Sequence, residues 1–227
     1  MSTELFEFLT ELKNNNNREW FKAHKKQYDR LYAWFIKEVQ EVIERIAVFD
    51  PEVAGLEAKG CIYRIYRDIR FSLDKTPYKT HFGAYITGVS DRTSCYAGYY
   101  IHLEPEGSFL SGGAWNPPPP LLKKLRKDIY DNIDEFLGII ENKEFKALYP
   151  ELEGGMLKRI PPEFPADSPY AEILKHKDFV VSARKPDAFF GTDNWKDVVI
   201  EDFKRLYPFN RFLNYTIREF LGRPSDY

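Results

Sequence analysis

Basic and aromatic side chains are concentrated between residues 63 and 83, where the sequence reads YRIYRDIRFSLDKTPYKTHFG. Several fixed cations on one short segment are what a phosphate or carboxylate ligand requires, because guanidinium and ammonium groups form charge-assisted hydrogen bonds with such anions. The cations that we expect to contact a ligand are Arg64, Arg67, Arg70, Lys75 and Lys79. The spacing therefore predicts a basic pocket for a small anionic ligand.

Three further residues of the segment complete the predicted site. Asp68 can hold a guanidinium in a bidentate pair, and Tyr78 can donate a hydrogen bond to a ligand. His81 ends the basic run, and neighbouring cations disfavour its charged form, which leaves a neutral imidazole able to act as a base. If the chain is an enzyme, we expect phosphoester or acyl chemistry with His81 as the catalytic residue.

The same residues fit a second class of protein, a structural or interaction module. Arginine stems cover apolar surface while their heads pair with acids, so the basic strand can be paired internally. It can equally dock an acidic partner. The residues do not identify a cofactor or a reaction, and they leave both classes open.

A metal site is a weaker alternative. His81 and His102 lie on neighbouring predicted strands, and with Asp68 or Glu104 they could meet around an ion. Hydrogen-bonded structural histidines are the commoner outcome, so we assign no metal ligand.

The charge of the chain is unevenly distributed. Between Lys59 and His81 there are six Lys or Arg and two Asp, a local charge of +4, although the net charge of all 227 residues is −2. The near-neutral total argues against general attraction to nucleic acid. Aromatic residues among the cations suit stacking on single strands, but the chain has no second basic stripe, so nucleic acid is the less favoured partner.

The composition predicts a cytoplasmic protein without a membrane segment. Cys61 and Cys95 are the only cysteines, which is too few for a disulfide scaffold. The acidic start, MSTELFEFLTELK, differs from a signal peptide, and no apolar run approaches the length of a membrane span.

Helical periodicity marks both ends of the chain. The apolar residues of 28–46 recur at three- and four-residue spacing, which predicts a long helix, with Asn16 as its N-cap in a capping box with Glu19. Apolar spacing predicts further helices over 121–140 and up to residue 221, the last broken at Pro208. Trp115 fits either a lid over the pocket or the core, and the core is preferred.

The central part favours strands, because β-branched and aromatic residues dominate there and glycines separate the runs. The predicted strands are 61–66, 82–88, 95–104, 108–113 and 178–185. Residues 62–70 also fit a helical spacing, and the strand is preferred on propensity. This order predicts a single α+β domain over 1–227, in which N- and C-terminal helices cover an antiparallel sheet of about four to six strands and leave its other face for a ligand or partner.

Several motifs together resemble the domain of unknown function 2461 family, which is largely bacterial and uncharacterised. The long basic motif RIYRDIRFSLDKTPYKTHFGAYI carries most of the resemblance, and Leu73 departs from the charged residue common in the family. The other matching motifs are NNNREWF at 15–21, the Gly–Tyr–Tyr strand at 98–100, GGxWxP at 112–117 and LKKLR at 122–126. The resemblance implies one domain over most of the chain and no particular activity.

Overall fold

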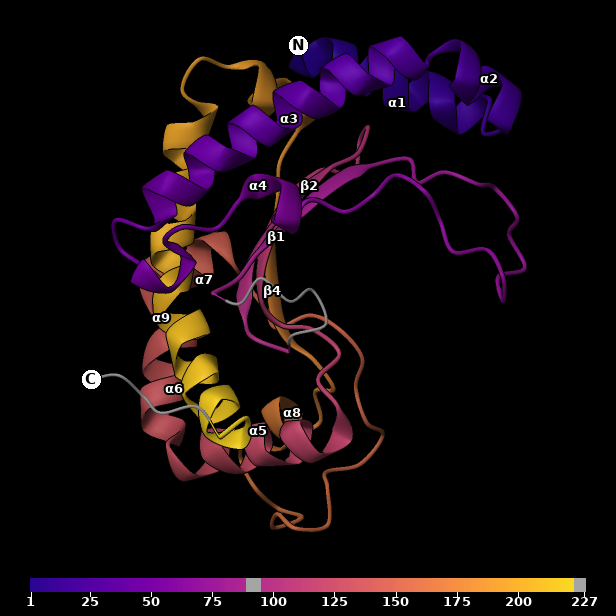
Figure 1. Cartoon of the computed structure of the whole chain (residues 1–227). Helices are drawn as coiled ribbons and strands as arrows, with labels where there is room; N and C mark the ends of the chain where they lie inside the picture. The colour runs from indigo at the N-terminus through magenta and orange to yellow at the C-terminus, as the bar shows by residue number, and fades with distance from the viewer. Residues whose placement is uncertain (89–94, 223–227) are drawn as a thin grey trace. The chain divides into compact units, whose positions relative to one another are not determined.

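A computed structural model describes residues 1–88 and 95–222 (Figure 1). Over these residues the protein has nine α-helices, two short 3-10 helices and one open antiparallel sheet of four strands in the order β1-β2-β3-β4. The α+β prediction is confirmed. The elements are α1 (Ser2–Asn14), α2 (Arg18–Ala23), α3 (Lys25–Ile46), η1 (Pro51–Val53), α4 (Ala58–Cys61), β1 (Phe82–Ile86), β2 (Gly98–Leu103), β3 (Phe109–Ala114), α5 (Pro119–Asp131), α6 (Ile133–Ile140), α7 (Lys143–Leu148), α8 (Ala171–Leu174), β4 (Phe179–Arg184), η2 (Asp187–Gly191) and α9 (Trp195–Phe220).

The described residues form two compact units, and the divisions between them fall within β2, β3, β4 and α9. The first unit holds residues 1–88, 100–110 and 184–200, and the second holds 95–99, 111–183 and 201–222. The single domain expected from the sequence stays a prediction.

Apolar stripes on α1 and α3 build the core of the first unit. In α3 the buried residues recur at three- and four-residue spacing, including Leu31, Phe35 and Val39, as an amphipathic helix requires. Phe35 packs on Phe82 of β1, with ring centroids 5.4 Å apart. Helix α3 therefore packs on β1 through the side chains that the periodicity marked.

Strand β2 separates a core face from a polar face. Tyr99, Ile101 and Leu103 are buried, and within the second unit Tyr99 packs on Phe203 of α9 at 5.1 Å between ring centroids. Because side chains alternate along a strand, Tyr100 and His102 point to the opposite face. This second face carries the polar groups of the candidate site.

Gly113 allows β3 and β4 to approach closely within the second unit. Its φ of 109° lies in the region that L side chains rarely adopt. A Cβ at this position would lie 2.0 Å from the carbonyl oxygen of Phe179. Any side chain here would have to push the two strands apart.

The strand predicted at 61–66 is wrong, and the helical alternative for 62–70 is absent too. Residues 62–70 are an irregular segment with two isolated antiparallel bridges, Ile62 to Ala84 and Tyr66 to Tyr78. Pro77 on the returning limb has no N–H to donate, which interrupts any continuous ladder. The β-propensity of the segment therefore gives separate bridges and no strand.

Three smaller predictions are also corrected. Asn17, not Asn16, caps α2 by accepting from the backbone N–H of Trp20 at 2.9 Å, and α2 is separated from α3. Helix α9 continues through Pro208, where buried apolar residues on both sides hold it together. Trp115 lies beyond the end of β3 with 74% of its surface exposed, outside the core.

Candidate functional site

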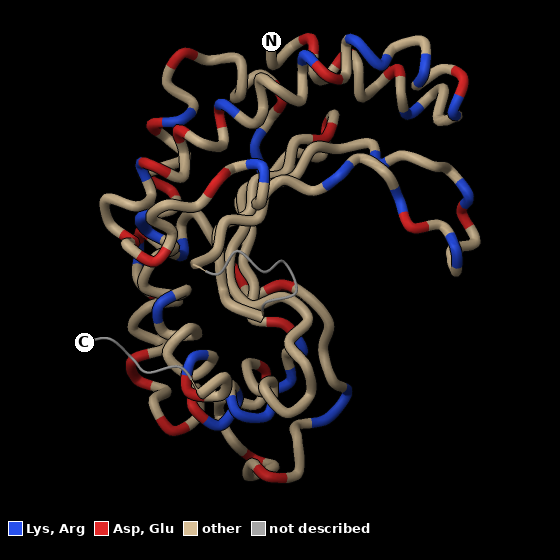
Figure 2. Tube along the Cα trace, in the orientation of Figure 1, with Lys and Arg blue, Asp and Glu red and all other residues tan. Residues whose placement is uncertain are grey.

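Residues 63–80 form an extended arm between α4 and β1, here called the basic arm (Figure 1). Its outgoing and returning limbs are joined by backbone hydrogen bonds from Arg67 N–H to the Pro77 carbonyl, at 3.0 Å, and from Lys79 N–H to the Ile65 carbonyl, at 2.8 Å. Figure 2 shows Lys and Arg in blue and Asp and Glu in red along it. The arm places the cations predicted from the sequence on an exposed projection.

The near part of the arm is anchored to the N-terminal helices. The side-chain amide of Asn16 both donates to the Tyr78 carbonyl, at 3.0 Å, and accepts from the Tyr78 N–H, at 3.1 Å. The ring of Tyr78 stacks on Phe21 with centroids 4.0 Å apart, and Tyr66 packs against both rings. Tyr78 is therefore buried, and its ring holds the arm in place.

Two of the five cations are paired with carboxylates of the arm itself. Arg70 makes a bidentate contact with Asp68, at 3.0 and 2.7 Å, and Arg67 bonds to Asp74 and to Thr76. The hydrogen bond from Arg70 lowers the pKa of Asp68 to about 2. Hydrogen bonds from the Thr76 N–H and from Arg67 lower the pKa of Asp74 to about 2. Both aspartates are therefore ionised at neutral pH and offset these two charges.

The tip of the arm is apolar and exposed. Phe71 and Leu73 are 96% and 102% exposed. Lys75 donates to the backbone carbonyl of Ile69, and no described carboxylate forms an ion pair with Arg64 or Lys75. With five cations and two aspartates, the arm has a net charge of +3, and the rest of the −2 chain sums to −5.

A polar cluster occupies the second face of β2 beside the base of the arm. Tyr100, His102 and Glu104 follow one another at two-residue spacing, and His81 reaches them from the residue before β1. The rings of His81 and His102 are 4.3 Å apart, and at least one ligand atom from each of His81, His102 and Glu104 lies within 4.8 Å of the others. The two histidines thus meet across neighbouring strands, together with Glu104 and without Asp68.

Hydrogen bonds fix the orientation of this cluster. The Tyr100 hydroxyl lies 2.8 Å from His102 Nδ1, and His102 Nε2 lies 3.2 Å from Glu104 Oε2. Thr80 donates to the other carboxylate oxygen, Glu104 Oε1, at 2.8 Å. Because an ionised carboxylate only accepts, the neutral His102 ring carries its proton on Nε2 and accepts from Tyr100 at Nδ1.

The environment keeps both imidazoles neutral and the carboxyl ionised. Burial, followed by the neighbouring His102, lowers the pKa of His81 to about 4, and burial also lowers the pKa of His102. Burial alone would raise the pKa of Glu104, but hydrogen bonds from Thr80 and His102 bring it below its usual value. Burial raises the pKa of Tyr100, so its hydroxyl stays protonated.

The predicted site residues therefore fall into two groups. The arm carries the seven predicted ligand-binding residues, and His81 belongs to the polar cluster. The catalytic role of His81 and the ligand-binding roles of the seven arm residues stay predictions. Tyr100 and Thr80 were not predicted. The two-residue spacing of Tyr100, His102 and Glu104, which places them on one face of a strand, is the signal that identifies Tyr100.

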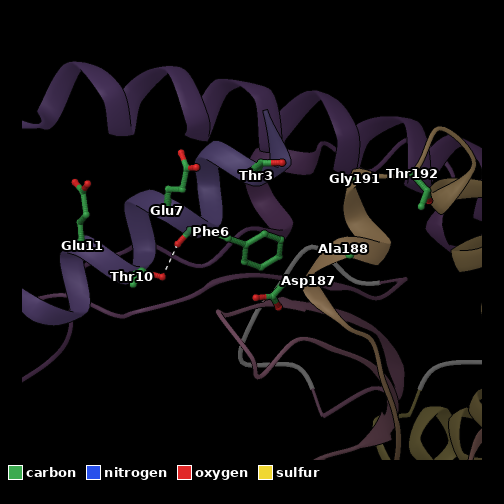
Figure 3. Close-up of a pocket in the computed structure, with 9 residues that line it drawn as sticks. All are labelled: Thr3, Phe6, Glu7, Thr10, Glu11, Asp187, Ala188, Gly191 and Thr192. Carbon is green, nitrogen blue, oxygen red and sulfur yellow. Dashed lines mark hydrogen bonds between the residues drawn. The ribbon is translucent and has the colours of Figure 1, made fainter.

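A hollow of about 730 Å³ between α1 and η2 has the wrong charge for an anion (Figure 3). Its lining includes the carboxylates of Glu7, Glu11 and Asp187, and no Lys or Arg lines it. None of the cations of the basic arm borders this hollow, so anion binding at the arm cannot use it.

The fold and site define an α+β protein with an exposed basic arm beside a histidine pair. The family model described as "Conserved hypothetical protein (DUF2461)" matches residues 4–212, and the chain belongs to this family. No curated protein and no solved structure is significantly similar to this chain. Within the described part of the chain, each helix is too short or too polar to cross a bilayer.

Proposed function

We propose that the chain binds an anionic ligand, bearing phosphate or carboxylate groups, through the basic arm. The observation that carries the proposal is the net charge of +3 on an exposed arm in a chain whose total charge is −2. This sum already includes Asp68 and Asp74, which pair with Arg70 and Arg67, whereas Arg64 and Lys75 have no described carboxylate in an ion pair. These two cations are the first contacts expected for a ligand.

The shape of the arm favours a ligand that lies along its surface over a small molecule enclosed in a pocket. Phe71 and Leu73 stand exposed at the tip, and the Arg70 guanidinium lies 5.9 Å from the centre of the Phe71 ring. An exposed apolar pair flanked by cations fits a partner that offers both carboxylates and apolar side chains. The ligand that fits best is therefore an acidic protein segment.

The competing function is a purely structural one, and specific contacts favour it too. Arg67 and Arg70 are already paired with Asp74 and Asp68, and Arg67 also bonds the Thr76 carbonyl across the two limbs at 3.2 Å. In that account the cations hold the arm together and bind nothing outside it. The two accounts differ at Arg64 and Lys75, whose removal breaks no ion pair between described residues.

The test compares two double variants with the same change in charge. Arg64→Ala with Lys75→Ala removes two cations of the arm, and Lys143→Ala with Lys158→Ala removes two exposed cations of the second unit. Binding of a fluorescent glutamate-rich peptide is measured by anisotropy at low ionic strength. We expect the arm variant to bind about tenfold more weakly, because each lost surface charge contributes a modest attraction, and the control to bind like wild type.

Three results would count against anion binding at the arm. The first is that the wild-type protein does not bind the peptide. The second is that both double variants weaken binding to the same extent. The third is that neither double variant weakens binding. A single-stranded oligonucleotide serves as the second probe, and preference for it over the peptide would identify phosphate as the recognised group. Unchanged thermal stability of the arm variant confirms that the comparison is made between folded proteins.

We also propose a cytoplasmic location. Cys61 and Cys95 are not joined in a disulfide, as expected in a reducing compartment. Fractionation of cells that express the full chain would test this, and recovery with the membrane or secreted fraction would contradict it.

A further inference from the structure

We propose that His81, His102 and Glu104 bind a divalent transition-metal ion of the zinc class. Two imidazoles and one carboxylate form a ligand set used by catalytic zinc sites and by non-haem iron sites. The three residues come from neighbouring strand segments and bring one ligand atom each to within 4.8 Å of the others. This inference is independent of anion binding by the arm.

The spacing of two of the donors already matches a tetrahedral site. His102 Nε2 and Glu104 Oε2 are 3.2 Å apart. Two ligands bound to one zinc ion at their usual bond lengths are separated by about 3.3 Å in tetrahedral geometry. An ion can therefore replace the hydrogen bond between these atoms with little movement of either residue, and a side-chain rotation of His81 brings in the third ligand.

The surrounding residues orient these donors as outer-shell partners do in known metal sites. Tyr100 contacts the distal ring nitrogen of His102 at 2.8 Å, which leaves Nε2 directed at the ion. Thr80 holds one oxygen of Glu104 at 2.8 Å, which leaves the other free to bind. Phe109 stacks on the His102 ring with centroids 4.5 Å apart and adds an apolar wall.

The cluster is accessible to an ion as well as oriented. His102 is buried, but His81 and Glu104 are only partly buried, so the ion can enter from the side of these two residues. Three protein ligands leave a fourth tetrahedral position for water or for an oxygen of an anionic ligand. The sequence assigned no metal ligand here, because hydrogen-bonded histidines are commoner, and the geometry points to revising that assignment.

Metal binding requires a change in the tautomer of His102. Without an ion, the ring proton lies on Nε2 and is donated to Glu104, and the Tyr100 hydroxyl donates to Nδ1. With an ion on Nε2, the proton lies on Nδ1 and is donated to the Tyr100 oxygen. This switch is a spectroscopic signature that simple electrostatic attraction of a cation would not produce.

The test is calorimetric titration of the full chain with zinc chloride after treatment with a chelator. Glu104→Gln keeps the oxygen that accepts from Thr80 but removes the charged ligand, and His81→Asn removes the second imidazole. Glu106→Gln is the matched control, because Glu106 is exposed in the turn that follows β2 and lies outside the cluster. We expect one ion per chain in wild type and control, and about tenfold or greater weakening in each of the other variants.

Long-range nitrogen–proton correlation spectra of the histidine rings provide the second measurement. Addition of zinc should shift the ring nitrogens of both His81 and His102 and move the His102 proton to Nδ1. The proposal is overturned if zinc does not bind with one-to-one stoichiometry. It is also overturned if Glu104→Gln and His81→Asn bind zinc like wild type, or if the His102 tautomer stays the same on binding.

Discussion

Replacing Asn16 with alanine should release the basic arm without unfolding the protein. The Asn16 amide makes two hydrogen bonds to the backbone of Tyr78, at 3.0 and 3.1 Å, and both are partly buried. A hydrogen bond of this kind contributes about 0.5–1.5 kcal/mol, so the loss of both should cost roughly 1–3 kcal/mol of local stability. Stacking of Tyr78 on Phe21 remains in the variant, so the helices should stay folded.

Native-state hydrogen exchange measures this cost directly. The amides of Arg67 and Lys79 are the reporters, because they donate across the two limbs of the arm, to Pro77 and Ile65. A loss of roughly 1–3 kcal/mol corresponds to exchange that is about 5- to 150-fold faster at these two amides. Amides in the buried part of α3 should exchange as in wild type.

Asn15→Ala is the matched control, since among the described residues the Asn15 side chain donates to the Glu11 carbonyl alone, on an exposed helix end. The reasoning would be refuted if Asn16→Ala left the two reporter amides unchanged. Equal acceleration in Asn15→Ala would refute it too, because the effect would then come from the end of α1 and not from the link to the arm.

Three further predictions concern the fold. Asn17→Ala removes the N-cap of α2 and should lower the free energy of unfolding by about 1 kcal/mol in urea titrations, whereas an unchanged midpoint would contradict the cap. Burial raises the pKa of Tyr149, so this side chain stays neutral in the folded protein at a pH where it ionises in the unfolded chain. The free energy of unfolding should therefore fall as the pH rises through about 10, and it should fall less steeply in Tyr149→Phe. Equal slopes in the two proteins would contradict this. Gly113→Ala combines a positive φ with a clash against the Phe179 carbonyl and should lower the melting temperature, and a neutral result would show that the strands can separate at no cost.

Much of the fold could be predicted because periodicity reports burial directly. The three- and four-residue spacing in 28–46 marked the stripe that α3 buries, and β-branched and aromatic residues between glycines marked the segment that forms β2. Residues 62–70 show the limit of this reasoning. Their β-branched and aromatic residues fit a strand, but the two limbs of the basic arm are joined only by separate bridges and by side chains among the described residues. The β-propensity of a segment does not show which of its backbone groups form hydrogen bonds.

Of the candidate site, the sequence showed the run of cations and His81, but it did not show their surroundings or the contribution of Tyr100 and Thr80. The run of cations was visible, whereas the pairing of Arg67 with Asp74 depends on how the chain folds back at 69–75. Asn16 was interpreted as a helix cap, because its contact with Tyr78 joins residues 62 positions apart, which local spacing cannot reveal. The meeting of His81 and His102 was foreseen as an alternative from their places on neighbouring strands, and only the structure selects Glu104 over Asp68.

The most direct test of anion binding by the basic arm is a titration of the nitrogen-15-labelled full chain with a glutamate-rich peptide, followed by backbone amide shifts. The account predicts that the largest shifts fall between Arg64 and Lys79 and grow with peptide until they saturate. Shifts that spread evenly over the exposed lysines of the molecule, or that leave this segment unchanged, would contradict it.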